Sequence, residues 1–298
     1  MVATVVEGEV EADRESAGPR VRRHPTAVVG ILLALSSGVL SASPANAAVT
    51  SSVSNGVLTV SGDGNDDVIT IQCLGGNVDL NGANPDTGPT ACSSITAIKV
   101  ASGGGNDAVS VSAVSRSVFN SLTDLTIHGG GDNDSIFGSP DADVLFGDGG
   151  SDTFYLVQGD DTIEGGTEGD RLTLSTSHDL VLTPSRLTTG DDDIAIASIE
   201  AVDLTSVGRG VRFDARQFHD DLFVTTDRGD DVLLGGTGSD RMSSGGGSDR
   251  LVGGRSTDYL VGGRGNDVLL GGPEVNYVDG SEGHERCRGG GVITNCES

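Results

Sequence analysis

Apolar and polar positions repeat in a fixed nine-residue frame over two blocks of the chain. From Gly129 the sequence reads GGGDNDSIF, GSPDADVLF, GDGGSDTFY, LVQGDDTIE and GGTEGDRLT. From Thr226 it reads TDRGDDVLL, GGTGSDRMS, SGGGSDRLV, GGRSTDYLV, GGRGNDVLL, GGPEVNYVD and GSEGHERCR. An apolar residue occupies the eighth position of each unit, with Cys287 in the last. A short apolar segment after a glycine-rich turn predicts a β-strand whose middle side chain points inward.

Acidic side chains occupy the sixth position of the same frame. Glycines at the first, second and fourth positions let the backbone turn tightly and aim peptide carbonyls inward. A carboxylate beside such carbonyls supplies the hard oxygen ligands that Ca²⁺ prefers. We therefore predict Ca²⁺ binding at these turns, with the following aspartates as ligands: Asp134, Asp143, Asp152, Asp161 and Asp170 in the first block, and Asp231, Asp240, Asp249, Asp258 and Asp267 in the second.

This register resembles the haemolysin-type, or RTX, calcium-binding repeat, G-G-x-G-x-D-x-U-x, in which U is a bulky aliphatic residue. The resemblance implies an all-β fold, a parallel β-roll or β-solenoid in which two units form one turn and Ca²⁺ lies between turns. Because an N-terminal leader is expected here, the chain is more similar to exported Gram-positive members of the family. Backbone ligands are expected from three turns: Gly147, Gly149 and Ser151; Gly235, Thr237 and Ser239; and Gly262, Arg264 and Asn266.

Several units depart from the motif. Five units carry another residue at the fourth position, where glycine is expected. Asn276 lacks the carboxylate, and Pro273 and Glu274 disturb its turn. The best-formed sites are therefore expected around Asp152, Asp161, Asp240, Asp249 and Asp267.

Residues 1–47 are typical of an export signal. Three arginines, Arg20, Arg22 and Arg23, precede an apolar run over residues 27–40, and Ala45-Asn46-Ala47 offers small residues for cleavage near Ala47. The apolar run is short for a membrane span. We expect a secreted, extracellular chain of residues 48–298 with no membrane insertion after cleavage.

Charge and cysteine content narrow the class further. The formal net charge of −26 argues against nucleic acid as a partner, because nucleic-acid binding requires basic patches. Four cysteines in an exported chain suggest disulfides, for which three pairings exist. Proximity in the sequence favours Cys73 with Cys92 and Cys287 with Cys296. A metal–thiolate site is the alternative, although no CxxC pair occurs.

The segments outside the two blocks follow the same pattern with longer strands. We interpret residues 48–128 and 174–225 as irregular β-rungs around the repeat blocks at 129–173 and 226–288, and residues 289–298 as a C-terminal cap. Single motif copies at Gly62–Asp66 and Gly103–Asp107 support this interpretation. A small β-sandwich is the alternative for residues 48–128.

These features favour a binding and structural protein rather than an enzyme, with Ca²⁺ as the partner and a surface or matrix association. A secreted enzyme that carries the repeats, such as a polysaccharide lyase, an epimerase or another hydrolase, is one alternative. A Ca²⁺-dependent adhesin is another. No HExxH zinc motif occurs, and Lys99 is the only lysine. Nothing in the sequence specifies a macromolecular partner.

Overall fold

The structure is a computed structural model, and it describes residues 49–156, 158–190, 192–206 and 210–297. The expected leader at residues 1–47 lies outside these residues. No helix in the described part of the chain is long and apolar enough to cross a membrane.

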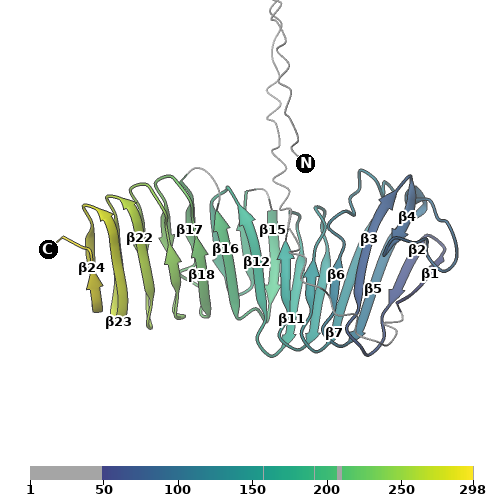
Figure 1. Ribbon diagram of the computed structural model, residues 1–298, viewed down its shortest axis with the longest axis horizontal. Coiled ribbons are helices and arrows are strands. Elements are labelled where there is room, and N and C mark those ends of the chain that lie inside the picture. The colour runs from purple at the N-terminus through teal and green to yellow at the C-terminus, as the bar shows by residue number, and fades with distance from the viewer. Residues whose placement is uncertain (1–48, 157, 191, 207–209, 298) are drawn as a thin grey trace, which may run out of the picture. The chain divides into compact units, whose positions relative to one another are not determined.

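Short strands follow one another along the chain and alternate between two columns of hydrogen-bonded neighbours (Figure 1). Column 1 contains the parallel strands β2 (Val57–Ser61), β5 (Ala97–Gly104), β7 (Asp124–Gly131), β9 (Val144–Gly149), β11 (Thr162–Thr167) and β15 (Asp192–Ala197), and it resumes with β17 (Arg212–Asp214), β19 (Val232–Leu234) and β21 (Arg250–Val252). Column 2 contains β3 (Val68–Leu74), β6 (Ala108–Ser110), β8 (Ser135–Phe137), β10 (Thr153–Leu156), β12 (Arg171–Thr176), β16 (Ala201–Ser206), β18 (Asp221–Thr225), β20 (Arg241–Ser243) and β22 (Tyr259–Gly265). The long strands β23 (Val268–Gly283) and β24 (Arg286–Thr294) extend through both columns.

The register of the columns shows that two nonapeptides form one turn. Leu233 pairs with Leu251 in column 1, and Met242 pairs with Leu260 in column 2. Each partner is two units further along the sequence. The parallel β-roll with irregular longer rungs, expected from the sequence, is therefore confirmed.

Eighth-position side chains from the two columns form the core. They belong to one apolar cluster, and residues such as Leu145, Phe154, Leu251 and Leu260 have no exposed surface. Most three-residue strands bury one central apolar side chain and leave its two neighbours less buried; in β19, Leu234 is buried as well. The core is therefore narrow and is built one side chain at a time.

Three antiparallel segments interrupt the parallel pattern. Strand β1 (Thr50–Ser54) forms a hairpin with β2 through Asn55 and Gly56, whose φ angles are 51° and 80°. Strand β4 (Asn77–Leu80) folds back on β3 through Gly75 and Gly76. Positive φ at both turn residues is the geometry of a type I′ hairpin. The sequence-based expectation of irregular rungs did not include these reversals.

The third interruption lies between the repeat blocks. Strands β13 (Leu180–Thr183) and β14 (Arg186–Thr189) are antiparallel, and β14 is antiparallel to β15. Strand β13 then pairs in parallel with β17, so column 1 continues through the meander. The core side chains Leu182 and Leu187 are buried there, and the core is thus uninterrupted.

Two disulfides are present, one among the first strands of the roll and one at its last strand. Cys73 on β3 is bonded to Cys92 in the 3-10 helix η1 (Cys92–Ser94), and Cys287 on β24 is bonded to Cys296. Both are the pairs that sequence proximity favours. The second bond attaches the C-terminal segment to the last rung of column 1.

Candidate metal sites in the turns

The turns between the columns form two rows, which we call the first edge and the second edge. First-edge turns that follow the nine-residue motif lead from column 1 to column 2 and comprise residues 62–67, 102–107, 129–134, 147–152, 165–170, 235–240, 253–258 and 271–276. Second-edge turns of the motif lead from column 2 to column 1 and comprise residues 138–143, 156 with 158–161, 226–231, 244–249, 262–267 and 280–285. Each turn ends in the sixth-position residue of its unit.

In most turns, one oxygen of the sixth-position carboxylate accepts a backbone N–H of the neighbouring turn. On the first edge, the backbone N–H of Asp134 donates to Oδ1 of Asp152 at 2.8 Å, and the N–H of Asp152 donates to Oδ1 of Asp170 at 2.8 Å. Asp240 donates to Asp258 in the same way. On the second edge, the same bond joins Asp143 to Asp161, Asp231 to Asp249, and Asp249 to Asp267. The structure thus arranges the ten predicted aspartates in rows that are linked by these hydrogen bonds, which we call ladders. The irregular rungs separate the ladders of the first block from those of the second.

The other carboxylate oxygen is, in most turns, buried without a hydrogen-bond partner. The aspartates concerned are at most 2% exposed. Buried polar atoms in proteins are almost always paired, so a repeated exception requires an explanation. The unpaired predicted ligands are Oδ2 of Asp134, Asp152, Asp161, Asp170, Asp249, Asp258 and Asp267, and Oδ1 of Asp240.

In several turns the first-position residue is a glycine that lies where oxygen atoms converge. A Cβ atom on Gly147 would lie 2.2 Å from Oδ2 of Asp152 and 2.4 Å from the carbonyl oxygen of Gly165 in the next turn. A Cβ on Gly235 would lie 2.3 Å from Oδ2 of Asp240 and 2.3 Å from the Gly253 carbonyl oxygen. At Gly147 the two oxygens face each other without a proton donor between them, which suits a cation. At Gly235 the Gly236 N–H donates to Asp240 Oδ2 at 3.0 Å, and the unpaired oxygen of Asp240 is Oδ1.

Electrostatics opposes this arrangement in the absence of a cation. Burial is the main cause that raises the pKa of Asp134 and Asp161 to about 7 and that of Asp240 to about 8. Neighbouring ladder carboxylates raise them further, whereas backbone N–H donors lower them. Two carboxylates about 5 Å apart repel by about 3 kcal/mol at an effective dielectric constant near 20. A divalent ion between the turns would offset both the cost of burying the charged carboxylates and their mutual repulsion. The residues therefore fit Ca²⁺.

The ligand set that these turns offer is mainly backbone oxygen. Among the described residues, no group of three or more His, Cys, Asp or Glu side chains is gathered as in a site made of side chains alone. Some of the predicted backbone ligands already accept hydrogen bonds: the Gly262 carbonyl from Ser244 Oγ at 2.7 Å, the Thr237 carbonyl from Ser256 Oγ at 2.8 Å, and the Arg264 carbonyl from the Gly247 N–H at 2.8 Å. A carbonyl oxygen has two lone pairs, so each can still bind an ion.

Two carboxylates on the first edge belong to the same ladder but were not predicted as ligands. The N–H of Asp67 donates to Oδ1 of Asp107, and the N–H of Asp107 donates to Oδ1 of Asp134. Oδ1 of Asp67 and Oδ2 of Asp107 are buried and unpaired. Counting six positions from Gly62 and from Ser102 reaches these two residues, so the motif contained the signal. Glu285 ends the second edge, also with unpaired buried oxygens.

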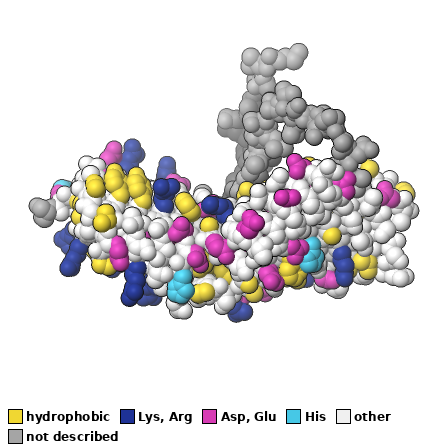
Figure 2. All heavy atoms as spheres, turned by 90° about the horizontal axis from the view of Figure 1, so that it is seen from below, with side chains coloured by type: hydrophobic (Ala, Val, Ile, Leu, Met, Phe, Trp, Pro, Cys, Tyr) yellow, Lys and Arg dark blue, Asp and Glu magenta, His cyan; other side chains and the backbone are white. Residues whose placement is uncertain are grey.

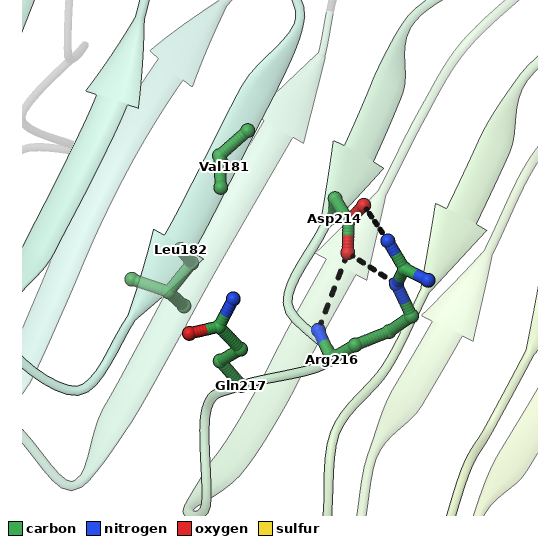
Figure 3. Close-up of a pocket in the computed structure, with 5 residues that line it drawn as sticks. All are labelled: Val181, Leu182, Asp214, Arg216 and Gln217. Atoms are coloured by element: carbon green, nitrogen blue, oxygen red, sulfur yellow. Dashed lines mark hydrogen bonds and ion pairs between the residues drawn. The ribbon is translucent and has the colours of Figure 1, made fainter.

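Acidic side chains outside the ladders are arranged differently. Figure 2 shows the Asp and Glu side chains of the visible face scattered over the surface, not gathered into one patch. A hollow of about 300 Å³ beside β13 is lined by Val181, Leu182, Asp214, Arg216 and Gln217 (Figure 3). There, Asp214 accepts hydrogen bonds from Arg216 and Arg212, and these arginines lower its pKa to about 2. Asp214 is thus already neutralised by cations of the chain, unlike the ladder carboxylates.

The stacked turns and their buried carboxylates define a β-roll built from nonapeptide repeats. The chain matches the RTX calcium-binding nonapeptide repeat in four copies, over residues 126–154, 155–182, 225–260 and 252–284. The chain therefore contains RTX calcium-binding repeats. No curated protein matches it.

Proposed function

We propose that this protein is an extracellular calcium-binding protein whose β-roll is stabilised by Ca²⁺ between successive turns. The single observation that carries the proposal is the buried, unpaired carboxylate oxygen that recurs in most turns. The predicted aspartates that carry such an unpaired oxygen, together with Asp67 and Asp107, are the acidic ligands. The backbone oxygens that converge near the first-position glycines complete the sites.

The role we propose is binding and structural rather than catalytic. Metal binding and folding are coupled here, because the metal offsets repulsion that a core of one side chain per strand offsets poorly. Two disulfides support an extracellular location, where thiols become oxidised. Extracellular calcium modules bind at roughly 10⁻⁴ to 10⁻³ M. The chain would therefore fold fully after it leaves the cell.

The test is a titration of the purified protein followed by far-ultraviolet circular dichroism and thermal unfolding. We expect a chain with less β-structure and a lower melting temperature in chelator, and a cooperative gain of β-structure and stability at millimolar Ca²⁺. Mg²⁺ should be a poor substitute because it requires a compact octahedral site. A chain that is fully β-structured in chelator and gains no stability from Ca²⁺ would exclude the proposed function.

A further inference from the structure

The turns do not all leave a carboxylate oxygen open. Among the sixth-position residues of the described chain, three have every side-chain polar atom paired within the protein: Asp143, Asp231 and Asn276. In each of these turns, a polar group of the chain itself pairs the side-chain atom whose counterpart stays unpaired in the other turns, including those that begin with Ser102 and Ser244.

Asn276 on the first edge replaces the carboxylate with an amide. Its Oδ1 accepts the N–H of Asp258 at 2.8 Å, the same bond that the aspartates make. Its Nδ2 lies 2.9 Å from the Cβ position of Gly271, where Oδ2 of an aspartate lies in other turns. Nδ2 donates to the Glu274 carbonyl at 3.0 Å and to the Gly272 carbonyl at 3.5 Å. The amide hydrogens thus satisfy carbonyls that would otherwise be available to an ion.

Thr226 on the second edge replaces the first-position glycine. Its Oγ1 lies 2.6 Å from Oδ2 of Asp231 and 3.0 Å from the carbonyl oxygen of Ser244 in the next turn. These are the equivalents of the two oxygens that face each other beside Gly147 and Gly235. Oδ1 of Asp231 accepts the N–H of Val211 at 2.7 Å. The hydroxyl therefore lies in the place where a cation fits in the glycine turns.

Ser139 has a similar effect from the second position of its unit. Its N–H donates to Oδ2 of Asp143 at 2.6 Å, and its hydroxyl donates to Oδ1 at 2.8 Å. Both residues are at most 2% exposed. The Asp143 carboxylate is consequently paired on both oxygens.

These three turns lie at the ends of their runs. Asp143 precedes Asp161 on the second edge of the first block, and Asp231 begins the second-edge run that continues with Asp249 and Asp267. Asn276 ends the first-edge run of the second block. An end turn has a neighbouring repeat on one side only, so an ion there would have fewer ligands.

We propose that Ser139, Thr226 and Asn276 are built-in substitutes for the metal ion, so that the turns at 138–143, 226–231 and 271–276 close without Ca²⁺ and border the turns that require it. This inference rests on the proposed calcium-binding function. It means that the chain takes fewer ions than its sixth-position residues suggest. Because each repeat interacts mainly with its neighbours, metal-free end turns would also keep the register from which the calcium-bound turns propagate.

The test is the number of Ca²⁺ ions bound per chain, measured by equilibrium dialysis and metal analysis at saturating Ca²⁺. Asn276→Asp and Thr226→Gly restore the motif, and each should bind one ion more than the wild-type chain. Thr226→Ser keeps the hydroxyl and should bind the wild-type number. Asp258→Asn introduces the same amide into an interior turn and should bind one ion fewer.

A second measurement uses the wild-type chain alone. Hydrogen exchange in chelator should be slower for residues 271–276 than for residues 253–258 by roughly tenfold, the equivalent of one additional hydrogen bond. Equal exchange in the two turns would overturn the inference, as would an unchanged ion number in both Asn276→Asp and Thr226→Gly while Asp258→Asn loses an ion. A wild-type chain that binds no Ca²⁺ would overturn the proposed function as well, so the two failures are distinguishable.

Discussion

The backbone N–H of Asp249 donates a 2.8 Å hydrogen bond to Oδ1 of Asp267, which lies 18 residues later and one full turn along the roll. Oδ2 of the same Asp267 side chain is buried and unpaired. The Asp267 carboxylate therefore has two separate roles, and Asp134, Asp152, Asp161, Asp170, Asp249 and Asp258 repeat them. One oxygen fixes the spacing of the turns, and the other is available to a metal ion.

Substitutions at Asp249 should separate these two roles. Asp249→Asn keeps an oxygen for the Asp231 N–H, which donates to Asp249 Oδ1 at 2.8 Å, and it removes the buried charge. We expect this variant to bind less Ca²⁺ but to be no less stable than the wild type in chelator. Asp249→Ala also removes the acceptor, and an unsatisfied buried N–H costs about 1–3 kcal/mol. Urea unfolding of both variants, with and without Ca²⁺, measures the difference. Equal loss of stability in chelator would contradict the separation.

Alanine at Gly147 should remove a calcium site by steric exclusion. A Cβ atom there would lie 2.2 Å from Asp152 Oδ2 and 2.4 Å from the Gly165 carbonyl oxygen, so the turn must open. We expect a weaker Ca²⁺ response and a lower melting temperature in Ca²⁺. Gly131→Ala is the matched control, because a Cβ at Gly131 has no atom within 4 Å. Thermal unfolding in Ca²⁺ compares the two, and similar melting temperatures would show that the glycine is not required for the site.

Removal of the Cys287–Cys296 disulfide should loosen the C-terminal end of the roll. The bond closes a short loop of sequence separation 9 and joins the tail to β24. In the chain-entropy account, a loop of this length contributes about 2–3 kcal/mol. We expect the double variant Cys287→Ala/Cys296→Ala to exchange amide hydrogens faster in β24 than in β21. The Cys73→Ala/Cys92→Ala variant is the control, since its effect should fall on β3 and β4. Mass spectrometry of unreduced peptides checks both pairings.

The nine-residue frame was sufficient to predict the parallel roll, because the inward apolar position and the turn aspartate recur together. Asp67 and Asp107 occupy the same motif position but were not predicted as ligands, because they lie outside the tandem units. Their ladder partners are 40 and 27 residues away, so the tandem register is hidden by long insertions. Their role becomes visible only when the strands are paired in space.

Strand direction between the blocks could not be read from the sequence. Alternation of apolar and polar residues in β13 and β14 is the same for parallel and antiparallel strands. The Asn55-Gly56 pair, by contrast, is a strong hairpin signal that the sequence did contain. The metal-substituting roles of Thr226 and Ser139 depend on which carboxylate each hydroxyl meets, and this follows from the turn geometry rather than from residue type.

Acidification should stabilise the roll in chelator. The pKa of Asp134 and Asp161 is raised to about 7 and that of Asp240 to about 8, from an ordinary value of 3.8, mainly because burial disfavours the charged form. The folded chain thus retains protons that the unfolded chain loses above pH 4. Stability in chelator should therefore be greatest near pH 4 and should fall as the pH rises to about 8. Asp214, whose pKa is lowered to about 2, acts in the opposite direction but only below about pH 4.

Calcium should reverse this dependence, because it binds the ionised carboxylates and competes with protons. Melting temperatures between pH 5 and pH 8 in chelator should fall with pH, whereas in Ca²⁺ they should rise or stay level. Asp240→Asn should flatten the decrease in chelator between pH 6 and pH 8. Asp227→Asn is the matched control, because it removes one negative charge from a side chain that is 58% exposed. If both variants flatten the profile equally, the pH dependence reflects the net charge of −26 and not the buried ladder.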